Sequence, residues 1–211
     1  MRLLVVIAGH NGAGKTTFYR KRLSHLLEHL LAENINADEI ERANTEELGE
    51  NAYTKKEFED LAADEATRLR KLYLQEEINF SFETVFSDPV QDKVGFMMEA
   101  RRRGYLVVLL AVGLESIEKS KERVAIRHAR GGHNVEPKKL EERYPRVLVN
   151  FAHGAQVASL AIFMDNSEDN PVEDGDAYWG VAFFEDGNLV VSDDSPPAWW
   201  QEVLRQLPVE P

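Results

Sequence analysis

The sequence predicts an α/β fold, in which a parallel five-stranded sheet carries helices on both faces and is followed by a small β-hairpin and a helix. Apolar runs of strand length alternate with segments whose apolar residues recur every three or four positions, the pattern of successive βαβ units. A glycine-rich turn follows the first run. The length of 211 residues suits one such domain with a small appendage.

The predicted strands are short apolar stretches bounded by polar turns. We expect them at residues 2–8, within 33–40 before a polar turn, and at 78–85, 105–112 and 159–164. Residues 78–85 alternate between apolar and polar side chains, whereas residues 105–112 are continuously apolar. A continuous apolar run is typical of a strand that is buried on both faces.

The predicted helices fill the intervals between these strands. We expect them at residues 15–32, 55–77, 89–103, 115–130 and from 137 to about 151. In residues 15–32 the apolar side chains, including Leu26 and Leu30, fall on one face. Residues 41–54 are polar and predict a surface loop or a short helix. Asp88 is expected to cap a helix that Pro89 starts, and Pro145 to kink or reset its helix.

The chain divides at the end of the last predicted core strand. Residues 1–167 form the expected core, and residues 168–211 form the expected C-terminal part. That part begins with an acidic loop, continues as a hairpin around Glu185-Asp186-Gly187-Asn188, and ends in a short helix with Trp199 and Trp200. We expect it to pack on the sheet edge, and a partner-binding patch is the alternative.

The composition narrows the classes of partner. The chain has 37 acidic and 25 basic residues, a formal charge of −12, and no cysteine. This balance argues against a nucleic-acid partner, and so against a nucleic-acid end kinase, because such a partner needs a basic groove. No apolar stretch is long enough to span a membrane. The absence of cysteine is typical of a reducing compartment, so we expect a cytoplasmic protein.

The chain is organised around residues 9–17, with the sequence Gly9-His10-Asn11-Gly12-Ala13-Gly14-Lys15-Thr16-Thr17. They fit the phosphate-binding P-loop pattern G-x-x-x-x-G-K-[ST], in which backbone N–H groups wrap around a phosphate. Lys15 would reach the β- and γ-phosphates, and the Thr16 hydroxyl would bind Mg²⁺. A purely structural glycine-rich turn is the alternative, but an apolar strand before it and a helix after it favour nucleotide binding.

Ligands of such a sheet bind outside the carboxyl ends of its strands. The second predicted strand delivers Asp38 to this edge, and the third delivers Glu83 and Thr84. Asp38 is expected to act as the base that receives a proton from an acceptor hydroxyl, and a helix cap is the alternative. Glu83 either contacts the substrate or is a solvated strand residue.

Residues 115–130 carry Lys119, Arg123, Arg127 and Arg130, which steps of four, four and three residues align along one helical stripe. This stripe is either a cationic wall for a transferring phosphoryl group or a solvated face paired with nearby acids. A glycine pair at residues 131–132 favours a mobile lid at about residues 128–143. Within it, His133 either touches phosphate or lies on the surface.

Two absent signatures bear on the reaction. No apolar strand ends in Asp-Glu, and there is no sequence like Leu-Ser-Gly-Gly-Gln. A motor or transporter ATPase would need a carboxylate that polarises water and a partner signature. The chain therefore looks like a kinase that passes a phosphoryl group to a bound hydroxyl.

On these residues the chain resembles the zeta toxin family of P-loop kinases, in the short branch often labelled predicted ABC-type ATPase. The resemblance covers about residues 3–166. It rests on residues 9–17, Asn36-Ala37-Asp38-Glu39-Ile40, Ser81-Phe82-Glu83-Thr84, Gly104-Tyr105, Arg123-Val124 with Arg127, Gly131-Gly132-His133-Asn134-Val135, Arg143-Tyr144-Pro145-Arg146 and Asp165-Asn166-Ser167. The branch often has proline in place of His10 and aspartate in place of Asn134.

The resemblance implies a kinase core in which ATP phosphorylates the 3′-hydroxyl of the amino sugar in UDP-N-acetylglucosamine. It implies that Lys15 and Thr16 hold ATP and Mg²⁺, and that Asp38 is the catalytic base. The remaining implied roles are acceptor binding by Glu83 with Thr84, phosphate clamping by Arg123 and either Arg127 or Arg130, and adenine contact by Asn166. An antitoxin partner is also implied. The alternatives are a kinase of another small nucleoside-type metabolite and a nucleotide-dependent module that regulates a protein partner.

Overall fold

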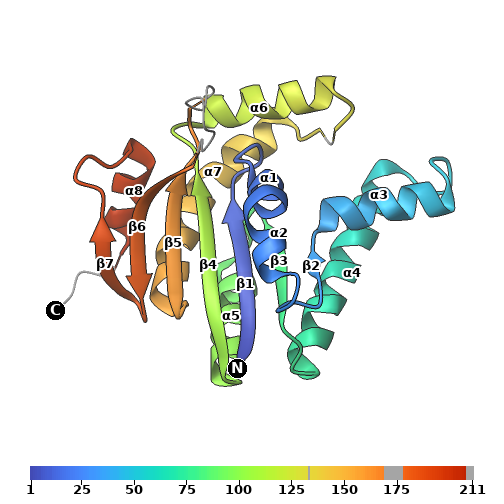
Figure 1. The fold of residues 1–211 in the computed structure, drawn as a ribbon. Helices are drawn as coiled ribbons and strands as arrows, with labels where there is room; N and C mark the ends of the chain where they lie inside the picture. The colour runs from blue at the N-terminus through green and yellow to red at the C-terminus, as the bar shows by residue number, and fades with distance from the viewer. Residues whose placement is uncertain (133, 169–177, 208–211) are drawn as a thin grey trace.

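The computed structural model describes residues 1–132, 134–168 and 178–207. Within them, one sheet of seven strands has the order β2-β3-β1-β4-β5-β6-β7 (Figure 1). The strands are β1 Arg2–Gly9, β2 Asn34–Ile35, β3 Phe80–Thr84, β4 Tyr105–Gly113, β5 Leu160–Asp165, β6 Trp179–Glu185 and β7 Asn188–Ser192. The first five are parallel, as predicted, and the hairpin β6–β7 extends the same sheet with two antiparallel strands.

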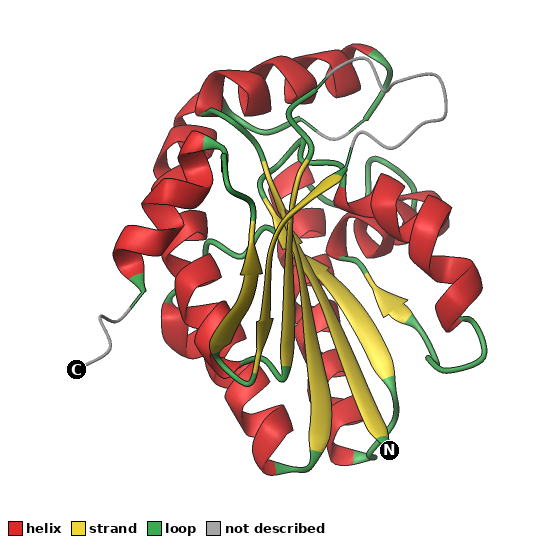
Figure 2. Ribbon diagram, turned by 60° about the vertical axis from the view of Figure 1, so that its left-hand side comes forward, coloured by secondary structure: helices red, strands yellow, loops and turns green. Residues whose placement is uncertain are grey.

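Helices cover both faces of the sheet, which confirms the predicted layering (Figure 2). They are α1 Lys15–Phe18, the π-helix η1 Tyr19–Leu23, α2 Ser24–Leu27, α3 Ala37–Leu48, α4 Lys55–Gln75, α5 Val90–Arg102, α6 Ile117–Ala129, α7 Pro137–Val157 and α8 Ala198–Gln206. None of the helices in the described ranges has the length and apolar character needed to cross a bilayer.

The central strand β1 is buried on both faces. Leu4 and Val6 belong to the larger core cluster, which α4, α5, α7 and α8 complete. Val5 and Ile7 belong to the second cluster, against which residues of α1, η1 and α2 pack. A strand buried in this way needs apolar side chains at successive positions, which is the run that the sequence displays.

The helix after the P-loop differs from the prediction. Instead of one helix over residues 15–32, the chain passes through the π-helical segment η1 and leaves helical structure after Leu27. A π-turn adds a residue to the helical turn and so rotates the positions that follow it. Leu23 and Leu27 therefore pack on the second core cluster, whereas Leu26 is 71% exposed and Leu30 is 52% exposed. The expectation that all these leucines share one face was wrong.

The polar segment after β2 has one of its two expected forms, a helix. It is the twelve-residue α3, which is capped by the Asn36 side chain. Pro89 occupies the cap position of α5, so the expected cap residue Asp88 lies one residue before it, within the usual uncertainty of a helix end. Helix α7 continues through Pro145, where the sequence predicts a kink or a reset of the helix.

The C-terminal helix α8 completes the core at the hairpin end of the sheet. The rings of Trp200 and Phe163 lie 4.7 Å apart, and Trp199 Nε1 donates to Asp165 Oδ2 at 2.6 Å. Gly113 permits this packing, because a Cβ there would lie 2.3 Å from the Trp199 ring. The acidic loop predicted before the hairpin lies outside the described residues from 169 onward, and the division of the chain at residue 167 stays a prediction.

Candidate active site

A cavity of about 1240 Å³ opens at the carboxyl edge of the parallel strands. It is lined by the P-loop and by residues of α3, α4, β3, α6 and α7. Pockets for a single small ligand usually enclose about 300–1000 Å³. The cavity is therefore larger than a site for one small ligand usually is.

The P-loop has the curled backbone that the pattern predicts. Gly12 and Gly14 adopt φ values of 79° and 92°, in the left-handed region that favours glycine. At Gly9 a side chain is excluded for another reason, because a Cβ would lie 2.3 Å from the Val112 carbonyl oxygen of β4. Each of these glycines is thus required by the geometry of the loop or by the approach of a neighbouring strand.

Segments far along the chain hold the loop in place. Ser120 Oγ of α6 donates to the Asn11 carbonyl at 2.7 Å. Asn166 Nδ2 donates to the Ala13 carbonyl at 2.8 Å, and Tyr178 Oη donates to the Gly14 carbonyl at 2.9 Å. Asn166 is thus a support of the loop, while its contact with an adenine stays a prediction.

Lys15 lies at the floor of the loop, where its Nζ donates to the carbonyls of Gly9 and His10 at 2.8 and 2.9 Å. Burial lowers the pKa of Lys15 to about 8, because the ammonium form loses hydration. Glu83 and Asp38 oppose this shift, and two nearby arginines of α6 and α7 add to it. An anion bound beside Lys15 would raise this pKa again, because it favours the ammonium form.

Thr16 and Glu83 meet at the side of the loop that faces β2 and β3. Thr16 Oγ1 donates to Glu83 Oε2 at 2.6 Å, and Asn34 Nδ2 donates to Glu83 Oε1 at 3.0 Å. The Asn36 amide lies 3.4 Å from Thr16 Oγ1. A hydroxyl beside a carboxylate is the kind of hard oxygen pair that suits Mg²⁺, which usually takes few protein ligands and completes its shell with phosphate oxygens and water.

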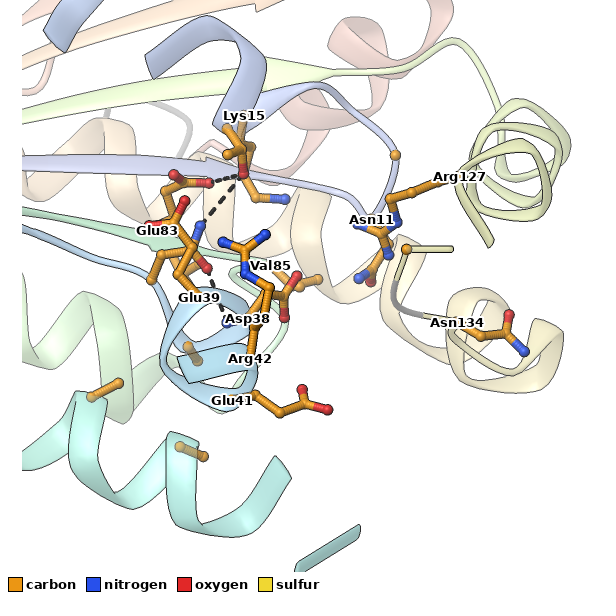
Figure 3. Close-up of a pocket in the computed structure, with 18 of the residues that line it drawn as sticks. Asn11, Lys15, Asp38, Glu39, Glu41, Arg42, Glu83, Val85, Arg127 and Asn134 are labelled. Atoms are coloured by element: carbon orange, nitrogen blue, oxygen red, sulfur yellow. Dashed lines mark hydrogen bonds between the residues drawn. The ribbon is translucent and has the colours of Figure 1, made fainter. Parts of the chain in front are cut away.

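Asp38 lies in the first turn of α3 and lines the same cavity. Its backbone N–H donates to Asn36 Oδ1 at 3.0 Å, so Asn36 is the helix cap and the Asp38 carboxylate is left to face the cavity. Figure 3 shows Asp38 on α3, near Lys15 and Glu83. The carboxylates of Asp38 and Glu83, which were predicted from the ends of two different strands, thus line the same cavity. Thr84 also lines the cavity, and its Oγ1 accepts from the Phe86 N–H at 3.0 Å.

The three arginines of the predicted stripe on α6 have different surroundings in the structure. Arg123 Nη1 donates to the Asn166 carbonyl at 2.5 Å and Nη2 to the Glu168 carbonyl at 3.0 Å. Arg127 points toward the P-loop residue Asn11 (Figure 3). Its Nε and Nη2 are buried and have no hydrogen-bond partner among the described residues. Arg130 directly follows α6 and also lines the cavity, but it is exposed. The free donors make Arg127 the member of the stripe best placed to receive an anion.

Two residues beside the loop have roles that the sequence did not predict. Arg143 was not predicted as a site residue, and His10 was predicted as part of the P-loop without any particular contact. Arg143 Nη1 of α7 donates to Asn11 Oδ1 at 3.3 Å, and Arg143 lines the cavity. The signal for it is helical spacing, because it lies one turn after the buried Leu140 and so faces the protein. The His10 ring stacks on Tyr144 at 4.3 Å, and burial lowers the pKa of His10 to about 3. His133 lies outside the described residues.

Comparisons with solved structures give the same fold. A chain from the PezAT chromosomal toxin–antitoxin system of Streptococcus pneumoniae has a TM-score of 0.62 at 16% identity, over 98% of this chain and 78% of that one. A chain of AvrRxo1-ORF1:-ORF2 with ATP has a TM-score of 0.59 at 16% identity, over 90% of this chain. A candidate kinase from Chloroflexus aurantiacus has a TM-score of 0.50 at 19% identity, over 66% of this chain and 72% of that one.

The present chain spans 60% of the AvrRxo1 chain that it matches. At these identities the likeness shows the fold alone, an α/β arrangement with a mostly parallel sheet. No curated protein matches the chain in sequence. A family profile described as an AAA domain matches residues 4–143, which is more than half of the sequence, and the chain therefore belongs to this AAA-domain family of P-loop proteins.

Proposed function

We propose that the protein is an ATP-dependent kinase that transfers the γ-phosphoryl group to a hydroxyl of a nucleotide sugar, such as UDP-N-acetylglucosamine. One observation carries the proposal: Lys15 and Thr16 of the P-loop share a single large cavity with the carboxylates of Asp38 and Glu83. A phosphate-binding loop provides the donor side, and a carboxylate beside it can receive the proton of an acceptor hydroxyl.

The donor side follows from the P-loop. Backbone N–H groups and Lys15 would hold the β- and γ-phosphates, and ATP is present in the structure of AvrRxo1-ORF1:-ORF2. Thr16 would contribute a ligand to Mg²⁺, which when bound neutralises phosphate charge. Glu83 would keep the Thr16 hydroxyl in place, since it already accepts a hydrogen bond from that group.

In the transfer step, Asp38 accepts the proton of the acceptor hydroxyl. The oxygen of that hydroxyl forms a bond to the γ-phosphorus at the same time. The bond between that phosphorus and the bridging oxygen breaks, and ADP leaves with the electron pair. Arg127 and Arg143 would stabilise the charge on the transferring group, because both act electrostatically on Lys15 and line the cavity. An antitoxin partner is part of the proposal, supported by the toxin–antitoxin system among the structural neighbours.

An acceptor panel tests the proposal. The protein is incubated with Mg-ATP and a series of UDP-sugars and nucleosides, and products are examined by mass spectrometry for the gain of one phosphoryl group. We expect one acceptor to gain phosphate and to stimulate ATP turnover, and Lys15→Ala to abolish both. ATP binding without phosphate on any small molecule would contradict the kinase and favour a nucleotide-dependent interaction module. Phosphate on a nucleoside alone would redirect the proposal to that class.

A further inference from the structure

A buried arginine lies in the part of the cavity formed by α4 and the loop after β3. Arg70 of α4 is 7% exposed, and its guanidinium carbon lies 5.3 Å from the centre of the Phe82 ring. Its Nη2 donates to Thr67 Oγ1 at 2.8 Å. Within the described residues its guanidinium makes no other hydrogen bond, although the group has five N–H donors. Burial lowers the pKa of Arg70.

No carboxylate of the described ranges lies within ion-pair distance of Arg70. Asp88 acts on it electrostatically, but the Asp88 carboxylate is paired with Lys93 at 3.4 Å. Lys93 lines the same cavity, and its side chain is 19% exposed. The corner thus holds two cations and one carboxylate. A buried charge without its own counter-ion is costly, so an anion supplied from outside would find a favourable place there.

The turn after β3, which lines the same cavity as Arg70 through Ser87 and Asp88, is built rigidly. Phe86 is fully buried and has a φ of 64°, an unfavourable value for a bulky side chain. The buried Asn150 amide holds this turn by donating to the carbonyls of Phe86 and Asp88, both at 2.8 Å. Ser87, between them, is buried and lines the cavity. Strain that surrounding contacts maintain in this way is typical of ligand sites.

We propose that Arg70 and Lys93 form an anion-binding subsite that takes a phosphate or carboxylate group of the acceptor. This inference rests on the proposed function and favours, among its candidate acceptors, the anionic nucleotide sugars over neutral nucleosides. The planar guanidinium favours a bidentate anion, and Lys93 adds a second point of attraction. Arg70 would then select the acceptor, while the P-loop end carries out the transfer.

Direct binding tests the subsite independently of catalysis. A saturating non-hydrolysable ATP analogue with Mg²⁺ first fills the P-loop. UDP, glucuronate and uridine are then titrated in separate calorimetric experiments, as phosphate, carboxylate and neutral probes. We expect at least one anionic probe to bind and uridine to bind more weakly. Arg70→Gln should raise the Kd of the bound anion about 100-fold and Lys93→Met about tenfold, because each removes a desolvated cation.

Arg68→Gln is the matched control, since Arg68 lies on the same helix but is exposed and paired with Glu65 at 2.7 Å. It should leave the Kd unchanged. Failure of both anions to bind the wild-type protein would overturn the subsite, as would unchanged binding in a folded Arg70→Gln or Lys93→Met variant. Thermal unfolding checks the fold, and Lys93→Met serves if Arg70→Gln does not fold. Anion binding without phosphorylation of any acceptor would overturn the kinase proposal and leave the subsite standing.

Discussion

The two ends of the cavity are built in different ways. The P-loop end is a contiguous stretch of backbone whose carbonyls are tied down by Ser120, Asn166 and Tyr178. The other end is made of side chains that come from α3, α4, β3 and the loop after it. Its members include Asp38, which is presented by a capped helix, and Arg70.

This difference in construction suggests different roles in recognition: general binding of nucleotides at the P-loop end, and selective binding of an acceptor at the other end. Backbone N–H groups wrapped around a phosphate read only charge and shape, so the P-loop end suits any nucleoside triphosphate. Side chains drawn from several elements can read one particular molecule. We therefore expect changes at the P-loop end to alter nucleotide binding, and changes at the acceptor end to alter turnover or acceptor choice.

Outside the P-loop itself, the largest expected effect is at Arg127 of α6, which lines the cavity. Arg127→Gln should lower the rate of phosphoryl transfer about 1000-fold. The reason is that Nε and Nη2 of Arg127 are buried, have no hydrogen-bond partner in the described part of the chain, and would stabilise the transferring group. Single-turnover kinetics with the acceptor found in the panel measures this rate. Arg130→Gln is the matched control, since Arg130 is exposed at the end of the same helix. A larger loss of transfer rate in Arg130→Gln than in Arg127→Gln would show that Arg130, and not Arg127, binds the transferring phosphoryl group.

Substitution of Asp38 should lower turnover without changing nucleotide binding. Asp38→Ala should reduce turnover at least about 100-fold and leave ATP affinity nearly unchanged, because it removes the base and no phosphate ligand. Turnover by a coupled assay and ATP affinity by calorimetry give the two numbers. Glu41→Ala, a further acidic residue of α3 on the cavity wall, is the control with little expected change. An Asp38→Ala protein with normal turnover would exclude Asp38 as the base.

The burial of His10 should appear as a pH dependence of stability at the P-loop end. The folded-state pKa of about 3 lies below the ordinary value of 6.5, so acid protonates the unfolded chain first. Stability from this group is complete above pH 6.5 and declines as the pH falls toward 3. Between pH 7 and pH 5 the wild-type protein should lose about 2 kcal/mol more than His10→Phe, which keeps a ring beside Tyr144.

Urea unfolding at the two pH values measures that difference. His29→Phe is the control, because the His29 side chain is 88% exposed and its removal should leave the wild-type pH dependence in place. Equal acid sensitivity of the wild-type and His10→Phe proteins would show that His10 titrates normally in the folded state.

The smallest expected effect concerns the charge of Lys15. Its pKa of about 8 means that the ammonium form declines above that pH in the free protein. Bound phosphate favours the ammonium form, so ATP binding should take up a proton and weaken about tenfold between pH 7 and pH 9. Calorimetry at pH 8.5 in buffers of different ionisation enthalpy detects the proton. Binding without proton uptake would mean that Lys15 is already fully charged before the nucleotide arrives.

Most of the fold could be predicted because its signals are local. The strand β4 and the helix α4 are marked by runs and spacings within a few residues, and both are present nearly as expected. The π-helical segment η1 could not be predicted, because no local preference distinguishes its residues from an ordinary helix. It is decided by how Leu23 and Leu27 pack against the sheet.

The residues of the site likewise differ in whether local sequence could predict them. The residues of the P-loop and Asp38 were identifiable from a motif and from the end of a strand. The equal spacing of Arg123 and Arg127 on one stripe gave no hint that the first would bond to main-chain carbonyls and the second would keep free donors. The pairing of Glu83 with Thr16 joins residues 67 positions apart, so no local pattern contains it.

By itself, therefore, the sequence determined the order of strands and helices along the chain, the phosphate-binding loop and a carboxylate after the next strand in the sequence. These depend on periodicity and on backbone geometry, which a few consecutive residues control. Only the tertiary structure decided that Arg127 and Arg143 face the loop and that the buried Arg70 lines one cavity with the strained turn after β3. Such placements depend on contacts between segments far apart in the chain, and we expect the choice of acceptor to depend on them.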